Sequence, residues 1–341
     1  MIFKCKNCGG NSVYSPEKKM MYCPFCDSEK SEERQYEHAR MQVCPNCGGE
    51  TAYTEHTSAM QCPYCDHYII LDERIEGAYT PGRIIPFKLG KESVKGLLRD
   101  KFKKCTFAPT DFLSEVRLNT MSGEYVPFWM YDYHTRCQFQ GEGIKSRSWI
   151  TDDMQYTERS YYNVVRDMGI EFQGIPADAS VKMPDGIMDL LEPYNYGELV
   201  AFRPEYMSGF MGEKYNMAAE MIESRAHAKM ESSASAMLQK SIGGYSFVTP
   251  VNRSITAPPP GTEFDLLPVW VYRYTYKDKE YPFYVNGQTG KIIGTTPVSK
   301  AKVWAYGATL WACLTAILVL LGVLSAYALT GIFTLLNTYS A

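Results

Sequence analysis

The sequence predicts a multidomain chain with tandem small four-cysteine zinc ribbons, a mixed β-rich α+β middle domain and a C-terminal transmembrane helix. Three observations support this prediction. One cysteine pattern occurs twice near the N-terminus, the middle is rich in aromatic and β-branched segments, and residues 303–341 carry no charge. The expected boundaries are residues 1–37 for the first ribbon, 38–75 for the second, 76–298 for the middle domain and 299–341 for the anchor.

The duplicated cysteine pattern consists of two CxxC pairs in each copy. Four thiolates on two short turns form the closed tetrahedral cage that a structural zinc ion requires. The eight predicted ligands are Cys5, Cys8, Cys23, Cys26, Cys44, Cys47, Cys62 and Cys65. We therefore expect two structural Zn²⁺ ions as cofactors. A closed cage leaves no coordination position for a reactive water, so the metal is expected to stabilise the fold and not to catalyse.

Two alternatives to zinc, and one to the ligand set, remain open from the sequence. Eight cysteines in a short segment also suit a disulfide framework in a secreted domain, but no signal peptide precedes Cys5. A rubredoxin-like iron site uses the same four thiolates. His67 lies two residues beyond Cys65 and is a candidate substitute ligand. The pairs Gly9-Gly10 and Gly48-Gly49 favour metal, because glycine permits the positive φ that turns amide N–H groups toward sulfur.

Periodicity predicts the elements that follow the first ribbon. Charge and spacing predict a linker helix at Glu29–Arg40, and apolar spacing predicts a second helix at Lys91–Lys104. Met211–Lys240 lacks proline and is rich in Ala, Met and Glu, so it predicts the longest soluble helix. Aromatic and β-branched residues predict strands at Tyr125–Phe139, Tyr156–Phe172 and Tyr245–Ile293.

A P-x-W-x-Y-x-Y motif occurs twice in the predicted strands. Alternation places the tryptophan and both tyrosines of each copy on one face of a sheet. We expect these side chains to pack in the core, and a small-ligand site on the aromatic sheet is the alternative. That site would be lined by Trp129, Tyr131, Trp270 and Tyr272. The five histidines show no metal or triad spacing, so we predict that the protein is not an enzyme.

The C-terminal segment is apolar over enough residues to cross a bilayer. About 20 apolar residues suffice, and the uncharged stretch from Val303 stays apolar to Leu336, so it must tilt, protrude or break into two short spans. Lys291, Lys300 and Lys302 precede this stretch, and no basic residue follows it. The positive-inside tendency therefore predicts a single-pass protein of the cell membrane with its N-terminal bulk in the cytoplasm.

The charge of the ribbons bears on the class of partner. Residues 1–75 contain eight Lys and Arg against eleven Asp and Glu. Each tetrathiolate zinc site adds about −2, so the double ribbon carries about −7. Binding to a phosphate backbone requires a basic surface. We therefore expect a membrane-associated or cytosolic protein partner and no nucleic acid; a nucleic-acid-linked role is the alternative, and homo- or hetero-oligomers remain open.

A basic cluster ends the predicted helix at Lys91–Lys104. Its members are Arg99, Lys101, Lys103 and Lys104. One interpretation is a solvated helix end whose positive charge complements the helix dipole. The other is a contact with anionic lipid or with an acidic partner.

Several of these features occur together in one known group of proteins. Duplicated Cys-Pro-x-Cys ribbons, the strands YVPFWMYDY and LPVWVYRY, the segment YVNGQTGKIIG and the C-terminal span resemble bacterial TFIIB-type zinc-ribbon membrane proteins of the YdjG type. The resemblance covers nearly the whole chain. It implies a companion role beside phage-shock-protein-A and SPFH (flotillin-like) proteins in envelope-stress protection. We accordingly expect a membrane-anchored adaptor that recruits a cytosolic protein.

Overall fold

The computed structural model describes residues 1–34 and 43–339, and its contacts divide the chain into two compact units. The sheet unit comprises Met1–Val94, Met121–Val271 and Tyr284–Ile293. The helix unit comprises Lys95–Thr120, Tyr272–Phe283 and Gly294–Ala341. Both units therefore draw on segments that are distant in the sequence.

An eleven-stranded sheet dominates the described part of the chain. Its path runs β10-β7-β13-β8-β11-β5-β6, and β9, β12, β14 and β15 join from the sides. The strands are β5 (Thr57–Gln61), β6 (Tyr68–Ile70), β7 (Arg83–Ile84), β8 (Ser122–Thr151), β9 (Met154–Asp178), β10 (Val200–Ala201), β11 (Met211–Glu213), β12 (Phe247–Thr256), β13 (Gly261–Tyr276), β14 (Lys279–Asn286) and β15 (Ile292–Gly294).

Smaller elements complete the sheet unit. Two two-stranded sheets form in the first ribbon, β1 with β4 and β2 with β3. Their bounds, with those of the short helices, are β1 (Ile2–Cys5), β2 (Val13–Ser15), β3 (Met20–Tyr22), β4 (Ser31–Arg34), η1 (Asp72–Arg74), η2 (Gly77–Tyr79), α3 (Asp185–Leu191), η3 (Tyr196–Glu198) and η4 (Pro204–Met207).

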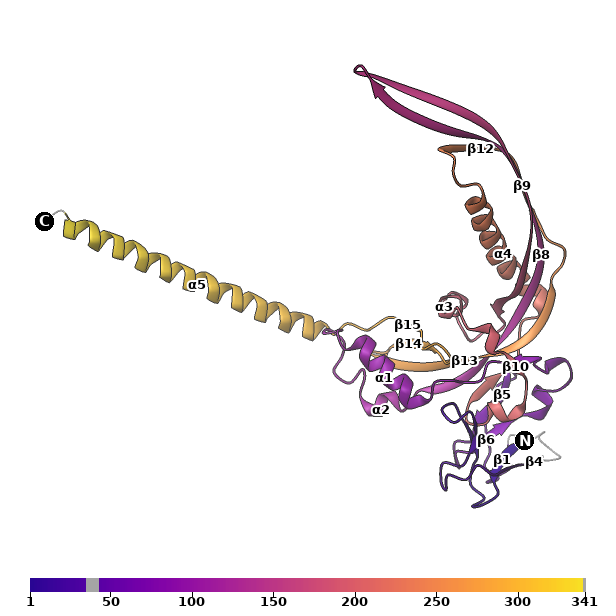
Figure 1. The fold of residues 1–341 in the computed structure, drawn as a ribbon. Helices are drawn as coiled ribbons and strands as arrows, with labels where there is room; N and C mark the ends of the chain where they lie inside the picture. The colour runs from indigo at the N-terminus through magenta and orange to yellow at the C-terminus, as the bar shows by residue number, and fades with distance from the viewer. Residues whose placement is uncertain (35–42, 340–341) are drawn as a thin grey trace. The chain divides into compact units, whose positions relative to one another are not determined.

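Strands β8 and β9 form one long antiparallel hairpin (Figure 1). Asp152 and Asp153 form its two-residue turn with φ of 50° and 61°, the left-handed pair that matches strand twist in a tight hairpin. Helix α4 (Ala219–Ser241) lies along one face of the hairpin, and β12 pairs with β8. The outer end of the hairpin projects beyond α4 and β12 (Figure 1).

The repeated aromatic motif is packed in the core, as predicted. Tyr131 and Tyr133 are buried against α4, and the Tyr131 hydroxyl donates to the Ala219 carbonyl at 2.6 Å. Trp129 donates through Nε1 to the Met217 carbonyl at 3.0 Å. Trp129 and Tyr131 therefore each find a backbone acceptor, as a buried donor requires.

Two predicted helices differ from the structure. The linker helix predicted at Glu29–Arg40 is wrong at Ser31–Arg34, which forms β4 and pairs with β1; residues 35–40 lie outside the described residues. The helix predicted from Met211 begins only at Ala219, and Met211–Glu213 forms β11 between β5 and β8. In both segments, pairing with a distant strand outweighs the local preference for helix.

The helix unit is built around a small aromatic cluster. The Phe112 ring contacts the rings of Phe102, Tyr274 and Phe283, with centroids 5.6, 5.1 and 5.1 Å away. Phe102 ends α1 (Lys91–Phe102), which confirms the helix predicted there, and a one-turn helix, α2 (Glu115–Leu118), follows. The remaining element is α5 (Lys300–Tyr339), which begins in this unit.

Helix α5 is one uninterrupted helix of 40 residues (Figure 1). At 1.5 Å per residue it is about 60 Å long, twice the thickness of a hydrocarbon core. The alternative of two short spans is therefore not observed. Lys300–Val323 is long and apolar enough to cross a membrane, and its most apolar part is not buried against the rest of the described chain.

Candidate metal centres and the surfaces around them

Each ribbon places its cysteines on turns of the same form. In the first ribbon, the Cys5 N–H donates to the Gly10 carbonyl at 2.8 Å, and the Gly9 N–H donates back to the Cys5 carbonyl at 2.9 Å. The turn at Cys23 makes the equivalent pair of hydrogen bonds with Ser28 and Asp27, both at 2.9 Å. The second ribbon reproduces both turns, at Cys44 and at Cys62. The internal duplication of the sequence is therefore a duplication of backbone geometry.

The distances between the sulfur atoms match those of a four-cysteine zinc site. In each cluster the four Sγ atoms all lie within 4.8 Å of one another. Two of the Sγ–Sγ separations are 3.5 and 3.6 Å in the first ribbon and 3.7 and 3.8 Å in the second. A tetrahedron with zinc–sulfur bonds of about 2.3 Å has edges of about 3.8 Å. A disulfide needs about 2.05 Å, so the predicted ligand sets fit a metal and do not fit disulfides.

The thiols of the two clusters differ in acidity before any cation binds. The pKa of Cys5 is lowered to about 6, first because the Cys8 backbone N–H donates to its sulfur. Burial raises the pKa of Cys44 to about 12, with the neighbouring thiols adding to the effect. Zinc binding requires all four thiolates, so it must release protons from such thiols. A divalent cation is the species that lets four thiolates share one cluster.

One asparagine lies beside each cage, and the two asparagines occupy equivalent positions. The side-chain amide of Asn7 donates to Cys26 Sγ at 3.6 Å, and that of Asn46 donates to Cys65 Sγ at 3.4 Å. Such contacts orient ligands and spread the thiolate charge. The asparagines recur in both copies of the sequence motif, but their contact with sulfur needed the structure.

The candidate ligand His67 lies beside the second cage and is not one of its four members. The four cysteine sulfurs already complete the cluster. The His67 Nδ1 is 3.1 Å from the Asn46 amide nitrogen and 3.3 Å from the Cys65 carbonyl oxygen. His67 therefore supports the residue that contacts Cys65 Sγ.

An aromatic ring covers the second glycine of each pair, which sequence reasoning missed. Gly9 and Gly48 have φ of 74°, as the glycine prediction requires. Gly10 instead leaves room for an aromatic ring, because a Cβ there would lie 2.9 Å from the Phe25 ring. Phe25 and its counterpart Tyr64 nevertheless expose 76% and 68% of their surface. The signal was an aromatic residue inside both Cys-Pro-x-Cys turns.

The second ribbon belongs to the main sheet. Strand β5 pairs with β11, and β11 pairs in parallel with β8. The first strand of the chain also contributes, because Ile2 is fully buried against Cys44, Cys62 and their neighbours. The two ribbons therefore share apolar contacts, and the second cage is joined to the sheet by backbone hydrogen bonds.

The four residues of the predicted basic cluster differ in their contacts, because one is held in an ion pair and the others are exposed. Arg99 forms an ion pair with Glu115, which also accepts a hydrogen bond from Lys95 Nζ at 2.6 Å. Lys103 and Lys104 follow the end of α1 and are exposed. Lys101 is also exposed, and its ammonium lies 5.8 Å from the centre of the Phe102 ring.

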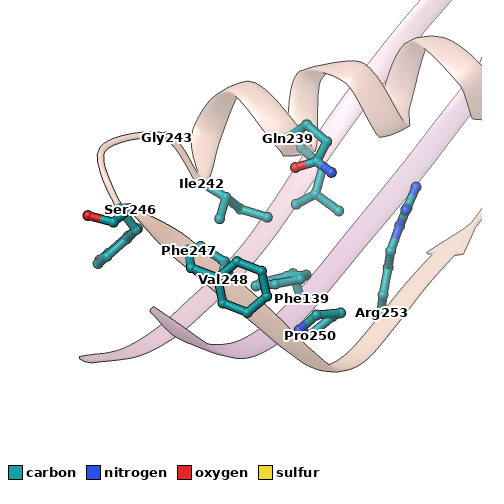
Figure 2. A pocket seen from close by; sticks show the side chains of 11 residues that line it. Phe139, Gln239, Ile242, Gly243, Ser246, Phe247, Val248, Pro250 and Arg253 are labelled. Carbon is teal, nitrogen blue, oxygen red and sulfur yellow. The ribbon is translucent and has the colours of Figure 1, made fainter. Parts of the chain in front are cut away.

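A separate cavity of about 400 Å³ lies between the end of α4, β8 and β12 (Figure 2). Its walls are mainly apolar, with Phe139, Ile242 and Phe247 among them. Arg253 is its only charged lining residue among those described, and the guanidinium already donates to the Ser235 hydroxyl. This cavity therefore offers no pair of acid and base groups. The four aromatic residues of the predicted ligand site lie elsewhere, and Tyr131 and Tyr272 are fully buried.

The chain is similar to one curated protein over most of both lengths. It is 37% identical over 314 residues to the uncharacterized protein YdjG of Bacillus subtilis (strain 168), covering 89% of this chain and 92% of that protein. No family model and no solved structure matches the chain. Identity at this level over this much of both chains means that the protein belongs to the YdjG family.

Proposed function

We propose that this protein is a non-enzymatic, membrane-anchored adaptor whose zinc ribbons recruit a cytosolic protein to the cell membrane. One observation carries the proposal: each ribbon presents an exposed aromatic ring, Phe25 or Tyr64, at the same position on a zinc-supported turn. Aromatic side chains on rigid turns are common anchors of protein interfaces. The ribbons carry about −7 with zinc bound, so the complementary partner surface is basic with apolar pockets.

Helix α5 supplies the anchor in this proposal, with the N-terminal bulk in the cytoplasm. Lys300 and Lys302 at its start support this orientation through the positive-inside tendency. A reducing cytoplasm also suits thiolates that bind metal. The resemblance that names phage-shock-protein-A and SPFH proteins as companions makes them the first partners to test, in a role under envelope stress. The TFIIB-type label concerns the shape of the ribbon, and the acidic surface disfavours DNA.

Photo-crosslinking in cells tests the adaptor function. A crosslinkable residue is placed at Phe25 or Tyr64 of the full chain, and captured proteins are identified. We expect the same protein at both positions, and its loss when Cys23→Ser and Cys62→Ser remove the two cages. The control is Val181, which is 70% exposed and lies outside the ribbons. Capture of nothing at the two ribbon positions, or of the same proteins at Val181, contradicts the proposal.

A further inference from the structure

We propose that Lys103 and Lys104, in the loop after α1, bind the phosphate headgroups of anionic lipids at the membrane surface. The proposal rests on the membrane anchoring by α5 proposed above. It assigns a ligand to the part of the predicted basic cluster that internal ion pairs do not use.

The loop is attached directly to the first turns of α5. The Ser299 N–H donates to the Phe107 carbonyl at 2.8 Å, and Lys302 Nζ donates to the Ala108 carbonyl at 2.7 Å. The Phe107 ring also packs edge-on against the Tyr306 ring, with centroids 5.5 Å apart. These three contacts fix the loop at the level where the apolar helix begins.

That level corresponds to the interface of a bilayer. Trp304 and Trp311 expose 79% and 69% of their surface and, with Tyr306, form the aromatic group expected between headgroups and acyl chains. Lys104 and Lys103 are three and four residues from Phe107. A chain of four residues spans at most about 14 Å, so both ammonium groups stay within reach of the headgroup layer.

The charge distribution favours an anionic surface. The helix unit has eleven Lys and Arg against five Asp and Glu, a formal +6. The remaining 24 Lys and Arg and 33 Asp and Glu give the sheet unit −9. Positive charge is thus concentrated in the unit that contains α5. Lys103 and Lys104 form no ion pair with any described carboxylate, whereas Arg99 pairs with Glu115.

Proximity decides between a lipid and a soluble acidic partner. The anchor holds the membrane surface next to the loop at all times, so lipid phosphate has a high effective concentration there. A lysine near an anionic surface contributes about 1 kcal/mol, which is about a fivefold preference. Two lysines therefore suffice to give a measurable preference for anionic lipid over neutral lipid.

The test uses the full zinc-loaded chain in vesicles of phosphatidylcholine mixed with phosphatidylglycerol. The protein is extracted with its bound lipid, and the ratio of the two retained lipids is measured by native mass spectrometry. We expect phosphatidylglycerol to be enriched, and the double variant Lys103→Glu/Lys104→Glu to lower this enrichment at least about tenfold. The matched control Lys18→Glu/Lys19→Glu reverses another exposed adjacent pair, in the first ribbon, and should leave it unchanged.

Three results would overturn the proposal. The first is equal enrichment in the wild type and the Lys103→Glu/Lys104→Glu variant while both retain two zinc ions. The second is loss of enrichment when glycerol phosphate is added, which would identify a site for free phosphate. The third is failure of the wild type to insert into any vesicle, which would refute the anchor as well. Insertion without enrichment refutes only the lipid contact, so the two failures are distinguishable.

Discussion

Tyr64 lies across Gly49 so closely that a Cβ at Gly49 would be 2.5 Å from its Cδ2 atom and 3.1 Å from its Cγ atom. The clash involves the base of the ring, so a small rotation of the side chain would not relieve it. The ring that we propose as a binding anchor can therefore occupy this position only because Gly49 has no side chain.

Gly49→Ala should weaken the second ribbon. Forcing the ring away is an overpacking change, for which a loss of about 1–3 kcal/mol is typical. We expect faster release of one of the two zinc ions to a chelating dye, and reduced crosslinking at position 64. Gly96→Ala is the control, because a Cβ there meets nothing within 4 Å and alanine favours helix. Equal zinc release from both variants would contradict this role of Gly49.

Removing one cysteine from either cage should halve the zinc content, with different consequences for the fold. Cys62→Ser and Cys23→Ser should each bind one zinc ion per chain by elemental analysis. Cys62→Ser should lower the melting temperature more, because the second ribbon supplies β5 to the main sheet. Cys105→Ser, outside both cages, should retain two ions. Equal melting temperatures for the two cage variants would show that the sheet does not depend on the second ribbon.

Arg83→Met should destabilise the sheet unit by about 3–5 kcal/mol. The Asp265 carboxylate is fully buried and accepts two hydrogen bonds from Arg83, at 2.7 and 3.3 Å. Without the guanidinium it would be a buried charge with no compensating cation, and the backbone N–H of residue 83 alone would not offset its burial. Arg136→Met is the matched control, because Arg136 makes the same two-point contact with the exposed Asp167 and should cost less than about 1 kcal/mol. Urea denaturation distinguishes the two, and similar losses would contradict the burial argument.

The stability of the helix unit should fall in acid through Glu115. Hydrogen bonds from Lys95 and then Arg99 hold the pKa of this carboxyl below its ordinary value of 4.5. A depressed pKa means that the stabilisation is present above about pH 4.5 and is lost as pH falls toward the folded-state value. Lys95 is only 3% exposed, but Glu115 is 54% exposed, so solvent screening keeps this contribution small.

Hydrogen exchange of the α1 and α2 amides measures this effect. Glu115→Gln should reduce protection at neutral pH and flatten its decline in acid. Glu231→Gln, on the exposed side of α4, should retain the wild-type profile, and the difference between the two profiles removes any contribution from acid release of zinc. If protection in the Glu115→Gln variant declined in acid as it does in the wild type, the acid sensitivity would belong to another group.

Local patterns in the sequence predicted the cages, α1, α5 and the long strands of the hairpin and of residues 247–286, but not the short strands β1–β7, β10 and β11. The CxxC spacing brings sulfur atoms together within a few residues, and an uncharged apolar stretch specifies its own helix. Distant pairing was not predictable in this way. Ser31–Arg34 has helix-forming residues yet pairs with β1, and the Arg99 ion pair with Glu115 depends on the path of the loop between α1 and α2. The contact between Tyr64 and Gly49 was likewise not predictable, because it depends on how the two cysteine turns face each other in the folded ribbon.

The pairing of β5 with β11 has a mechanical consequence. Backbone hydrogen bonds run across the strands, so a force along β5 loads the pairs Ala59–Gly212 and Thr57–Glu213 together instead of opening them one at a time. A protein that pulls on Tyr64 would therefore load β11 and β8 and would not simply strip the cage from its support. In the adaptor that we propose, this joint would let the second ribbon bear the load of a bound protein.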